Sequence, residues 1–183
     1  MRLLTLILLA GFSASVGAQF GSFGSSFERT RPNQIGDEEE QRWQELETEL
    51  PRFPRMDGLV EFYVSAVATN AYLIDPETLS VGADGVVRYV LVVRTRGGST
   101  NVSLEGIHCK QQQWKHYAAG HVGDGTWTRA RAGRSDWRPI ENKPVNRHHA
   151  ALSRDLFCPM GSPIASADEG RNALRAGRHP NAN

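Results

Sequence analysis

Hydrophobic and polar residues alternate along the middle of the chain, as they do in β-strands that bury one face. The alternation is clear over residues 59–67, which we expect to form a strand. Residues 86–95 and 100–109 carry many β-branched and aromatic side chains and are separated by a turn at Gly97-Gly98. Two such segments joined by a short glycine turn predict a long β-hairpin.

Shorter segments of the same kind flank this hairpin. Residues 71–74 predict a strand that ends at Asp75-Pro76, and residues 114–118 and 125–128 predict a further pair. Glycine and aspartate residues mark the turns between neighbouring segments, as in a meander. The pattern therefore predicts a mainly antiparallel sheet of about five or six strands.

Two segments have a helical period instead. Residues 37–50 are acidic at their start, where Asp37 can cap a helix, and Pro51 stops the pattern. Between Asn146 and Pro159, apolar residues again recur every three or four positions. With an N-terminal acidic helix and a C-terminal helix around the sheet, the predicted fold class is α+β.

The first 18 residues have the composition of a secretory signal peptide. Arg2 gives a positive start, residues 3–12 are almost entirely apolar, and small residues precede the bond between Ala18 and Gln19. We expect cleavage after Ala18 and export to the periplasm. The apolar run is about half of the roughly 20 residues that a membrane-spanning helix needs, so we expect a protein that does not span the membrane.

The remaining flanks differ in composition from the central segment. Residues 19–35 are rich in glycine, serine and phenylalanine, so we expect residues 19–50 to hold a flexible linker followed by the short acidic helix. Residues 51–160 hold the predicted α+β domain. Residues 161–183 contain few large apolar side chains, and we expect them to form a disordered tail.

The charge argues against one class of function. The chain has 21 lysine and arginine residues against 20 aspartate and glutamate residues, and removal of residues 1–18 takes away Arg2, which leaves 20 of each sign. Proteins that bind nucleic acids generally need a surplus of positive charge. We therefore expect no nucleic-acid partner.

Cys109 and Cys158 are the two cysteines of the chain. In an oxidising compartment, an isolated pair most simply forms a disulfide. A metal-binding or redox pair is the alternative, but there is no C-x-x-C spacing and no third thiol. We predict a Cys109–Cys158 disulfide, which would join the end of the central hairpin to the end of the second helix.

Several short motifs follow one another in the central segment. They are Ser80-Val81-Gly82, Asp84–Tyr89, Asn101–Cys109, Trp114–Tyr117, Trp137–Ile140 and Asp155–Pro159. In this order they resemble the cryptic neisserial protein-like family of small exported proteobacterial proteins. The resemblance covers roughly residues 50–160 and implies a periplasmic protein. It implies no assigned activity, and it carries no catalytic residue over to this chain.

A binding surface is the first functional hypothesis. Aromatic and arginine side chains concentrate at the contact surfaces of binding proteins. Tryptophan residues on strands more often belong to the core or to cross-strand pairs, so a structural role stays open. The candidates are Arg88, Trp114, Trp127, Trp137 and Arg138, and the partner would be an envelope protein or a glycan.

A small periplasmic enzyme is the alternative hypothesis. The sequence has no G-x-S-x-G motif, and the disulfide removes both thiols as nucleophiles. What remains is a hydrolase-like set of acids and histidines: Glu105, His108, His149 and Asp155. If the disulfide holds the second helix against the hairpin, His149 could approach Glu105 or His108 and act as a general base. Ordinary surface hydrogen bonds of Glu105 and Asp155 are the competing interpretation.

Six histidines raise the question of a metal. Neighbouring residues on a helix point about 100° apart, so we expect that His148 and His149 do not both face one ion. The chain also has no H-x-x-x-H or H-E-x-x-H motif. We therefore predict no metal site and no cofactor. The sequence as a whole favours a non-enzymatic periplasmic protein that binds a partner in the cell envelope.

Overall fold

The computed structural model describes residues 43–144 and 147–182 of the chain. The predicted signal peptide with its cleavage site between Ala18 and Gln19, the linker, the start of the acidic segment and Asn146 lie outside the described residues.

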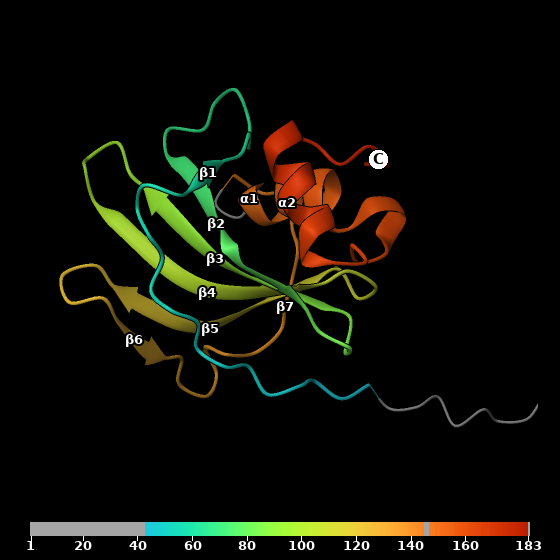
Figure 1. The fold of residues 1–183 in the computed structure, drawn as a ribbon, viewed down its shortest axis with the longest axis horizontal. Coiled ribbons are helices and arrows are strands. Elements are labelled where there is room, and N and C mark those ends of the chain that lie inside the picture. Colours follow the sequence, from blue (N-terminus) through green and yellow to red (C-terminus); the bar gives the residue numbers. More distant parts are fainter. Residues whose placement is uncertain (1–42, 145–146, 183) are drawn as a thin grey trace, which may run out of the picture. The chain divides into compact units, whose positions relative to one another are not determined.

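Seven strands of the described part form one sheet (Figure 1). Strands β1 to β6 are neighbours in sequence order, every pairing is antiparallel, and β7 pairs with β5. Their bounds are β1 Val60–Glu61, β2 Ala71–Val81, β3 Val86–Arg94, β4 Thr100–His108, β5 Gln113–His121, β6 Thr126–Arg129 and β7 Arg138–Pro139. The prediction of an antiparallel meander is confirmed.

Strands β3 and β4 form the long hairpin that the pattern predicts. Their register pairs Val86 with His108 at one end and Arg94 with Thr100 at the other. Gly98 has a φ of 86° in the connecting turn, a conformation that glycine adopts without steric cost. The hairpin thereby fixes which side chains of the two strands lie opposite each other.

Two strands differ from their predicted lengths. β1 covers only Val60–Glu61 of the strand expected over residues 59–67. β2 does not end at Asp75-Pro76 but continues to Val81, with a shift of register between Asp75 and Ser80. A bulge is where a strand tolerates proline, because proline has no N–H to give to the ladder.

The sheet has a core on each of its two faces. On one face, side chains of β2 to β5 pack against the C-terminal helices; the residues include Ile74, Val87, Tyr89, Leu91, Ile107, Leu152, Leu156, Phe157, Ile164 and Leu174. On the other face, Val90, Val92, Val102, Leu104 and Tyr117 pack against Leu50, Phe53, Met56 and Trp127. Successive residues of one strand therefore enter different cores.

The C-terminal part is helical beyond the predicted end. Helix α1 (Arg147–Ala151) continues into the π-helix η1 (Leu152–Phe157), and together they form the predicted second helix. A short 3-10 turn, η2 (Pro159–Gly161), follows. Helix α2 (Ala167–Ala176) then packs on the sheet with Ala173 and Leu174 buried. The expectation of a disordered tail was wrong, because a few small apolar residues on one face of α2 suffice to dock it. No helix among the described residues is long and apolar enough to cross a membrane.

Residues 43–50 were predicted to continue the acidic helix, and that prediction was wrong. They have no helical structure and run across the face opposite the helices, as the cyan chain in Figure 1 shows. Trp43, Leu46 and Thr48 bond to Asp84 and Arg88 of the β2–β3 region. These tertiary contacts outweigh a helix propensity that is worth only tenths of a kcal/mol per residue.

Candidate functional site

A buried carboxylate lies where helix α1 meets the sheet. Glu105 of β4 is 5% exposed, and one of its oxygens, Oε2, lies 2.9 Å from Nε2 of His149 on α1. His149 is 2% exposed. Residues 105 and 149 are far apart in the sequence, and the packing of α1 on the sheet brings them together.

Two hydroxyl groups complete the surroundings of this carboxylate. Ser103 lies two residues before Glu105 on the same face of β4, and its Oγ donates to Oε1 at 2.8 Å. Tyr89 is paired directly opposite Glu105 in the β3–β4 register, and its hydroxyl donates to Oε2 at 3.2 Å. The carboxylate thus has three hydrogen-bond partners from three elements.

These contacts set the charge of the carboxylate. Burial alone would raise the pKa of the Glu105 carboxyl, but the proximity of His149 and hydrogen bonds from His149 and Ser103 outweigh it and lower that pKa to about 2. Burial, and then the Glu105 charge, raise the pKa of the Tyr89 hydroxyl. Glu105 is therefore ionised at neutral pH, whereas Tyr89 keeps its proton.

The two adjacent histidines lie together, contrary to our expectation. The rings of His148 and His149 are 4.0 Å apart between centroids. His149 stacks on Trp114 of β5 at 3.8 Å, and His148 stacks on Tyr72 of β2 at 4.9 Å. The Cα–Cβ directions diverge on a helix, but side-chain torsions and these aromatic contacts turn the rings back toward each other.

The histidine pair and the carboxylate form a group with the composition of a metal site. One ligand atom from each of Glu105, His148 and His149 can be chosen so that all three lie within 4.8 Å of one another. Burial, followed by the neighbouring His149, lowers the pKa of the His148 imidazole to about 4. At neutral pH the group therefore offers an anionic carboxylate and a neutral His148 imidazole.

The structure does not bring His108 and Asp155 to this group. His108 is three residues from Glu105 on β4, and its ring lies on the opposite face, 4.7 Å from the ring of Trp43. Asp155 forms ion pairs with Arg154 and Arg178. Of the four residues in the catalytic hypothesis, only Glu105 and His149 are in contact.

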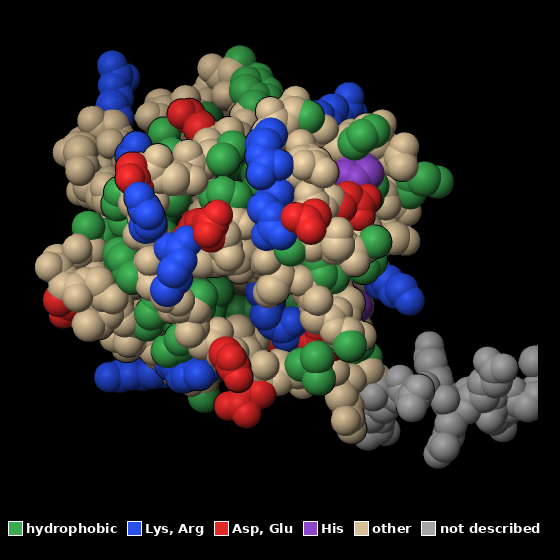
Figure 2. Space-filling model, in the orientation of Figure 1, with side chains coloured by type: hydrophobic (Ala, Val, Ile, Leu, Met, Phe, Trp, Pro, Cys, Tyr) green, Lys and Arg blue, Asp and Glu red, His purple; other side chains and the backbone are tan. Residues whose placement is uncertain are grey.

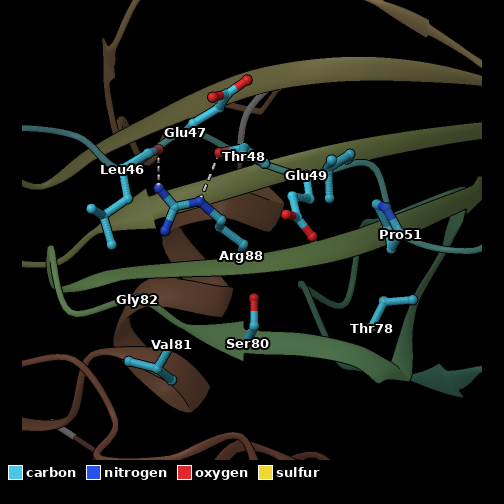
Figure 3. A pocket seen from close by; sticks show the side chains of 11 residues that line it. Leu46, Glu47, Thr48, Glu49, Pro51, Thr78, Ser80, Val81, Gly82 and Arg88 are labelled. Atoms are coloured by element: carbon cyan, nitrogen blue, oxygen red, sulfur yellow. Dashed lines mark hydrogen bonds between the residues drawn. The ribbon is translucent and has the colours of Figure 1, made fainter.

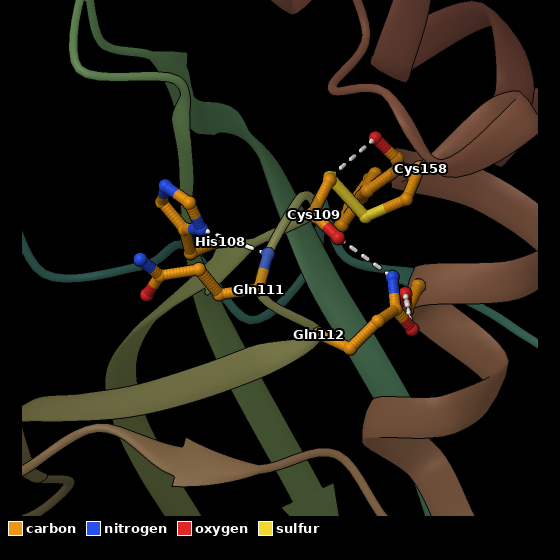
Figure 4. The surroundings of a disulfide bond; sticks show 7 residues. His108, Cys109, Gln111, Gln112 and Cys158 are labelled. Carbon is orange, nitrogen blue, oxygen red and sulfur yellow. Dashed lines mark hydrogen bonds between the residues drawn. A yellow bond between two sulfur atoms is a disulfide. The ribbon is translucent and has the colours of Figure 1, made fainter. Parts of the chain in front are cut away.

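The predicted disulfide is present. Cys109 and Cys158 are bonded, with their Cα atoms 5.4 Å apart, and the bond joins the end of β4 to the residue after η1 (Figure 4). In the same view, the ring of His108 points away from the disulfide, and its Nδ1 accepts a hydrogen bond from the N–H of Gln111 at 3.1 Å. The disulfide holds the helical segment that carries His148 and His149 close to the strand that carries Glu105.

The five residues of the binding hypothesis do not form one surface. Trp114 is buried against His149, whereas Arg138 is exposed and lies 5.6 Å from the centroid of the Trp114 ring. Trp127 and Trp137 are half-buried, Trp127 against Phe53 and Trp137 against Trp43. Arg88 is buried beneath residues 46–48. These positions lie on both faces of the sheet.

Arg88 instead forms one end of a pocket that sequence reasoning did not identify. The pocket has a volume of about 260 Å³ and lies between residues 46–51 and strands β2 and β3. Figure 3 shows the Arg88 side chain reaching Leu46 and Thr48, with Ser80 and Thr78 of β2 below it. Hydroxyl and carboxylate groups dominate the polar lining: Thr48, Thr78, Ser80, Glu47 and Glu49.

Comparison with known proteins identifies the family of the chain. The model of the CNP1-like family matches residues 38–175. A protein of Neisseria gonorrhoeae named cryptic neisserial protein 1 is 27% identical over 179 residues, a match that covers 88% of this chain and 86% of the relative. No solved structure matches the chain. The match extends past residue 160 and includes most of α2, which the sequence resemblance did not cover.

Proposed function

Because the chain belongs to the CNP1-like family, as its sequence motifs predicted, and this family is uncharacterised, we propose a function from the site geometry. The protein is a non-enzymatic binding module of the cell envelope that takes a small polar ligand, a glycan unit, in the pocket under residues 46–51. The pocket is the observation that carries this proposal. Its volume of about 260 Å³ lies slightly below the range for small-molecule sites, roughly 300 to 1,000 Å³, so it suits a ligand about the size of one sugar ring.

The lining of the pocket supports a ligand rich in hydroxyl groups. The Ser80 hydroxyl can both donate and accept a hydrogen bond. The Thr78 hydroxyl donates to the carbonyl of Asp75, so its oxygen is left as an acceptor, and the carboxylates of Glu47 and Glu49 offer further acceptors. Arg88 is a positioning residue here, because its guanidinium bonds to Thr48, Leu46 and Asp84 and holds residues 46–48 above the sheet.

A glycan-binding measurement with a pocket-filling variant tests the proposal. Ser80 is exposed in the pocket, so Ser80→Phe should fill it without disturbing either core. We expect some saccharides of a cell-envelope panel to shift the amide resonances of residues 46–49 and 78–82, and Ser80→Phe to abolish those shifts. Ser162→Phe, an exposed serine on the helical side, is the matched control and should bind as the parent does. If no saccharide binds, or if Ser80→Phe binds equally well, the proposal is wrong.

Export is part of the proposal, and it rests on the N-terminal sequence. A stable disulfide is typical of an oxidising compartment such as the periplasm, which supports export. The mass of the protein recovered from a periplasmic fraction should correspond to a chain that begins at Gln19. Recovery of the uncleaved chain from the cytoplasm would contradict it.

A hydrolase-like enzyme is the second candidate, supported by the contact between Glu105 and His149. A carboxylate that orients an imidazole is the arrangement of a general base. The burial of both groups disfavours it, because a substrate would have to displace α1 or its neighbours. Loss of complementation by a folded Glu105→Ala, His149→Ala double variant in a knockout strain would favour the enzyme, and unchanged complementation would contradict it.

A further inference from the structure

We propose that Glu105, His148 and His149 bind a divalent transition-metal ion, for which zinc is the best candidate. The site lies between α1 and the sheet, on the face opposite the glycan pocket, and it does not depend on the proposed function. Three ligand side chains converge at the site, a buried nitrogen of His148 has no hydrogen-bond partner in the described part of the chain, and neighbouring contacts hold the three side chains in place.

The ligand types match the ion. Two imidazoles and one carboxylate form a common zinc-binding set, and imidazole nitrogen favours zinc, copper and nickel over calcium or magnesium. The three ligand atoms lie within 4.8 Å of one another. In a tetrahedral zinc site, bonds of about 2.0 to 2.1 Å place ligand atoms roughly 3.3 Å apart, so binding requires only a modest contraction.

One edge of this triangle is already close to the required length. His149 Nε2 and Glu105 Oε2 are 2.9 Å apart and share a proton in a hydrogen bond. An ion that binds both atoms displaces that proton from Nε2, and the neutral imidazole then carries its proton on Nδ1. The adjacent His148 ring, 4.0 Å from the His149 ring between centroids, supplies the third ligand.

The unpartnered Nδ1 of His148 points independently to a missing ligand. Nδ1 of His148 and Nδ1 of His149 are buried and have no hydrogen-bond partner within the part of the chain that the structure describes. A buried polar atom without a partner costs roughly 1 to 3 kcal/mol, so such atoms are rare in native proteins. Coordination of an ion by a His148 ring nitrogen would offset part of this cost.

The surrounding residues hold the three ligands rigidly. Ser103 and Tyr89 donate hydrogen bonds to the Glu105 carboxylate, which restricts its rotation. Trp114 and Tyr72 stack on the two imidazoles. Groups that orient metal ligands in this way typically raise metal affinity, and their loss costs about 10- to 100-fold.

Titration of the purified, tag-free chain with zinc chloride tests the proposal. The protein is first stripped with a chelator under oxidising conditions, so that the Cys109–Cys158 disulfide stays intact and no thiol competes for the ion. Calorimetry should show one zinc ion per chain and no binding of calcium. Cobalt chloride should give the visible absorption spectrum of a bound, low-symmetry ion.

Substitutions in the group should remove this binding. Glu105→Gln and His148→Gln should each weaken zinc binding by about 100-fold or more, since each removes a direct ligand, and Tyr89→Phe should weaken it by about 10-fold. His121→Gln is the matched control: this exposed histidine contacts Thr128 near the end of β5, and its loss should leave zinc binding unchanged.

A loss of zinc binding can be distinguished from a loss of folding. His148 is less buried than Glu105, so His148→Gln provides a folded test even where Glu105→Gln impairs folding, and thermal unfolding of each variant monitors the fold. Absence of zinc binding by the parent protein overturns the proposal. The proposal is also overturned if folded His148→Gln binds zinc as well as the parent does. A loss of zinc binding in His121→Gln as large as that in His148→Gln overturns it too. None of these results affects the glycan proposal, which is tested at Ser80.

Discussion

At the scale of single residues, Asp84 holds together segments that are distant in sequence. Its carboxylate accepts hydrogen bonds from Arg88 at 2.7 and 3.1 Å and from the N–H of Leu46 at 2.9 Å, and its carbonyl accepts one from the indole of Trp43. Gly82 lies against this ion pair, since a Cβ there would be 2.2 Å from the carboxylate. Asp84 therefore fastens residues 43–48 to the β2–β3 turn and so holds Leu46 and Thr48, which line the pocket, in place.

Asp84→Asn should destabilise the protein by about 3 kcal/mol at pH 7, because it leaves the buried Arg88 guanidinium without its counter-charge. Burial alone would raise the pKa of Asp84, but hydrogen bonds from Arg88 and from backbone N–H groups lower it below its ordinary value of 3.8. A depressed acid pKa stabilises the fold above the unfolded pKa, and that contribution is lost as the pH falls through the folded pKa. The difference between parent and variant should therefore shrink below pH 3.8.

Urea unfolding at several pH values measures this difference. Asp57→Asn is the control, since Asp57 forms an exposed ion pair with Arg55 and its loss should have little effect on stability. A stability difference that stays constant from pH 7 to pH 2 would show that the Asp84 charge does not stabilise the fold.

At the scale of elements, local sequence patterns predicted the strands and turns of the sheet well, but they predicted the structure of residues 43–50 and of the C-terminal segment poorly. The β3–β4 hairpin was predicted from its β-branched residues and its glycine turn. Both favour a hairpin through interactions between residues that are close in the sequence. Residues 43–50 have a helical pattern, but they form no helix, and hydrogen bonds join them to Asp84 and Arg88. Helix α2 was missed because its buried face consists mainly of small residues, which a search for large apolar side chains overlooks.

Gly170 shows how closely α2 packs. A Cβ at this position would lie 2.4 Å from Leu79 Cδ2 and 2.6 Å from Ile164 Cδ1. Gly170→Ala gains about 1 kcal/mol of helix propensity, but overpacking a core costs about 1 to 3 kcal/mol. We expect a net destabilisation of about 1 kcal/mol in chemical denaturation.

Asn172→Ala is the control for this prediction, because Asn172 is exposed on the same helix. This variant should leave stability unchanged or slightly raised. If Gly170→Ala proved more stable than the parent, α2 would not pack against Leu79 as tightly as the structure has it.

At the scale of the whole molecule, the sheet separates the two candidate sites. One face carries the helices and the group Glu105, His148 and His149, and the other carries the pocket beneath residues 46–51. Figure 2 shows the molecule in the orientation of Figure 1, with acidic and basic side chains interspersed over the visible face. The Cys109–Cys158 disulfide is the covalent link between the sheet and the helices.

Reduction of this disulfide should destabilise the protein by about 4 kcal/mol, because the bond closes a loop of 49 residues in the unfolded chain. Urea unfolding with and without a reductant measures the effect. In a Cys109→Ala, Cys158→Ala variant, the reductant should have no effect. An identical unfolding midpoint for the oxidised and reduced parent protein would contradict the prediction.

The sequence by itself predicted an antiparallel sheet, the central hairpin, the disulfide and the family, whereas the order of the strands came from the structure. Strand alternation, turn glycines and a single cysteine pair are local or unambiguous signals, so they need no knowledge of the packed fold. The structure, and not the sequence analysis, supplied the register that places Tyr89 opposite Glu105 and showed that Glu105 and His108 lie on opposite faces. Strand alternation is the signal that could have separated Glu105 from His108.

Only the tertiary structure decided how Glu105, His148 and His149 converge and how residues 43–50 cross the sheet. The position of a helix on a sheet depends on side-chain packing between segments that are 40 or more residues apart, as in the contact of Glu105 with His149. Neither periodicity nor motif spacing records such contacts, because they depend on which faces pack together and at what angle. The candidate sites of this protein arise at that level.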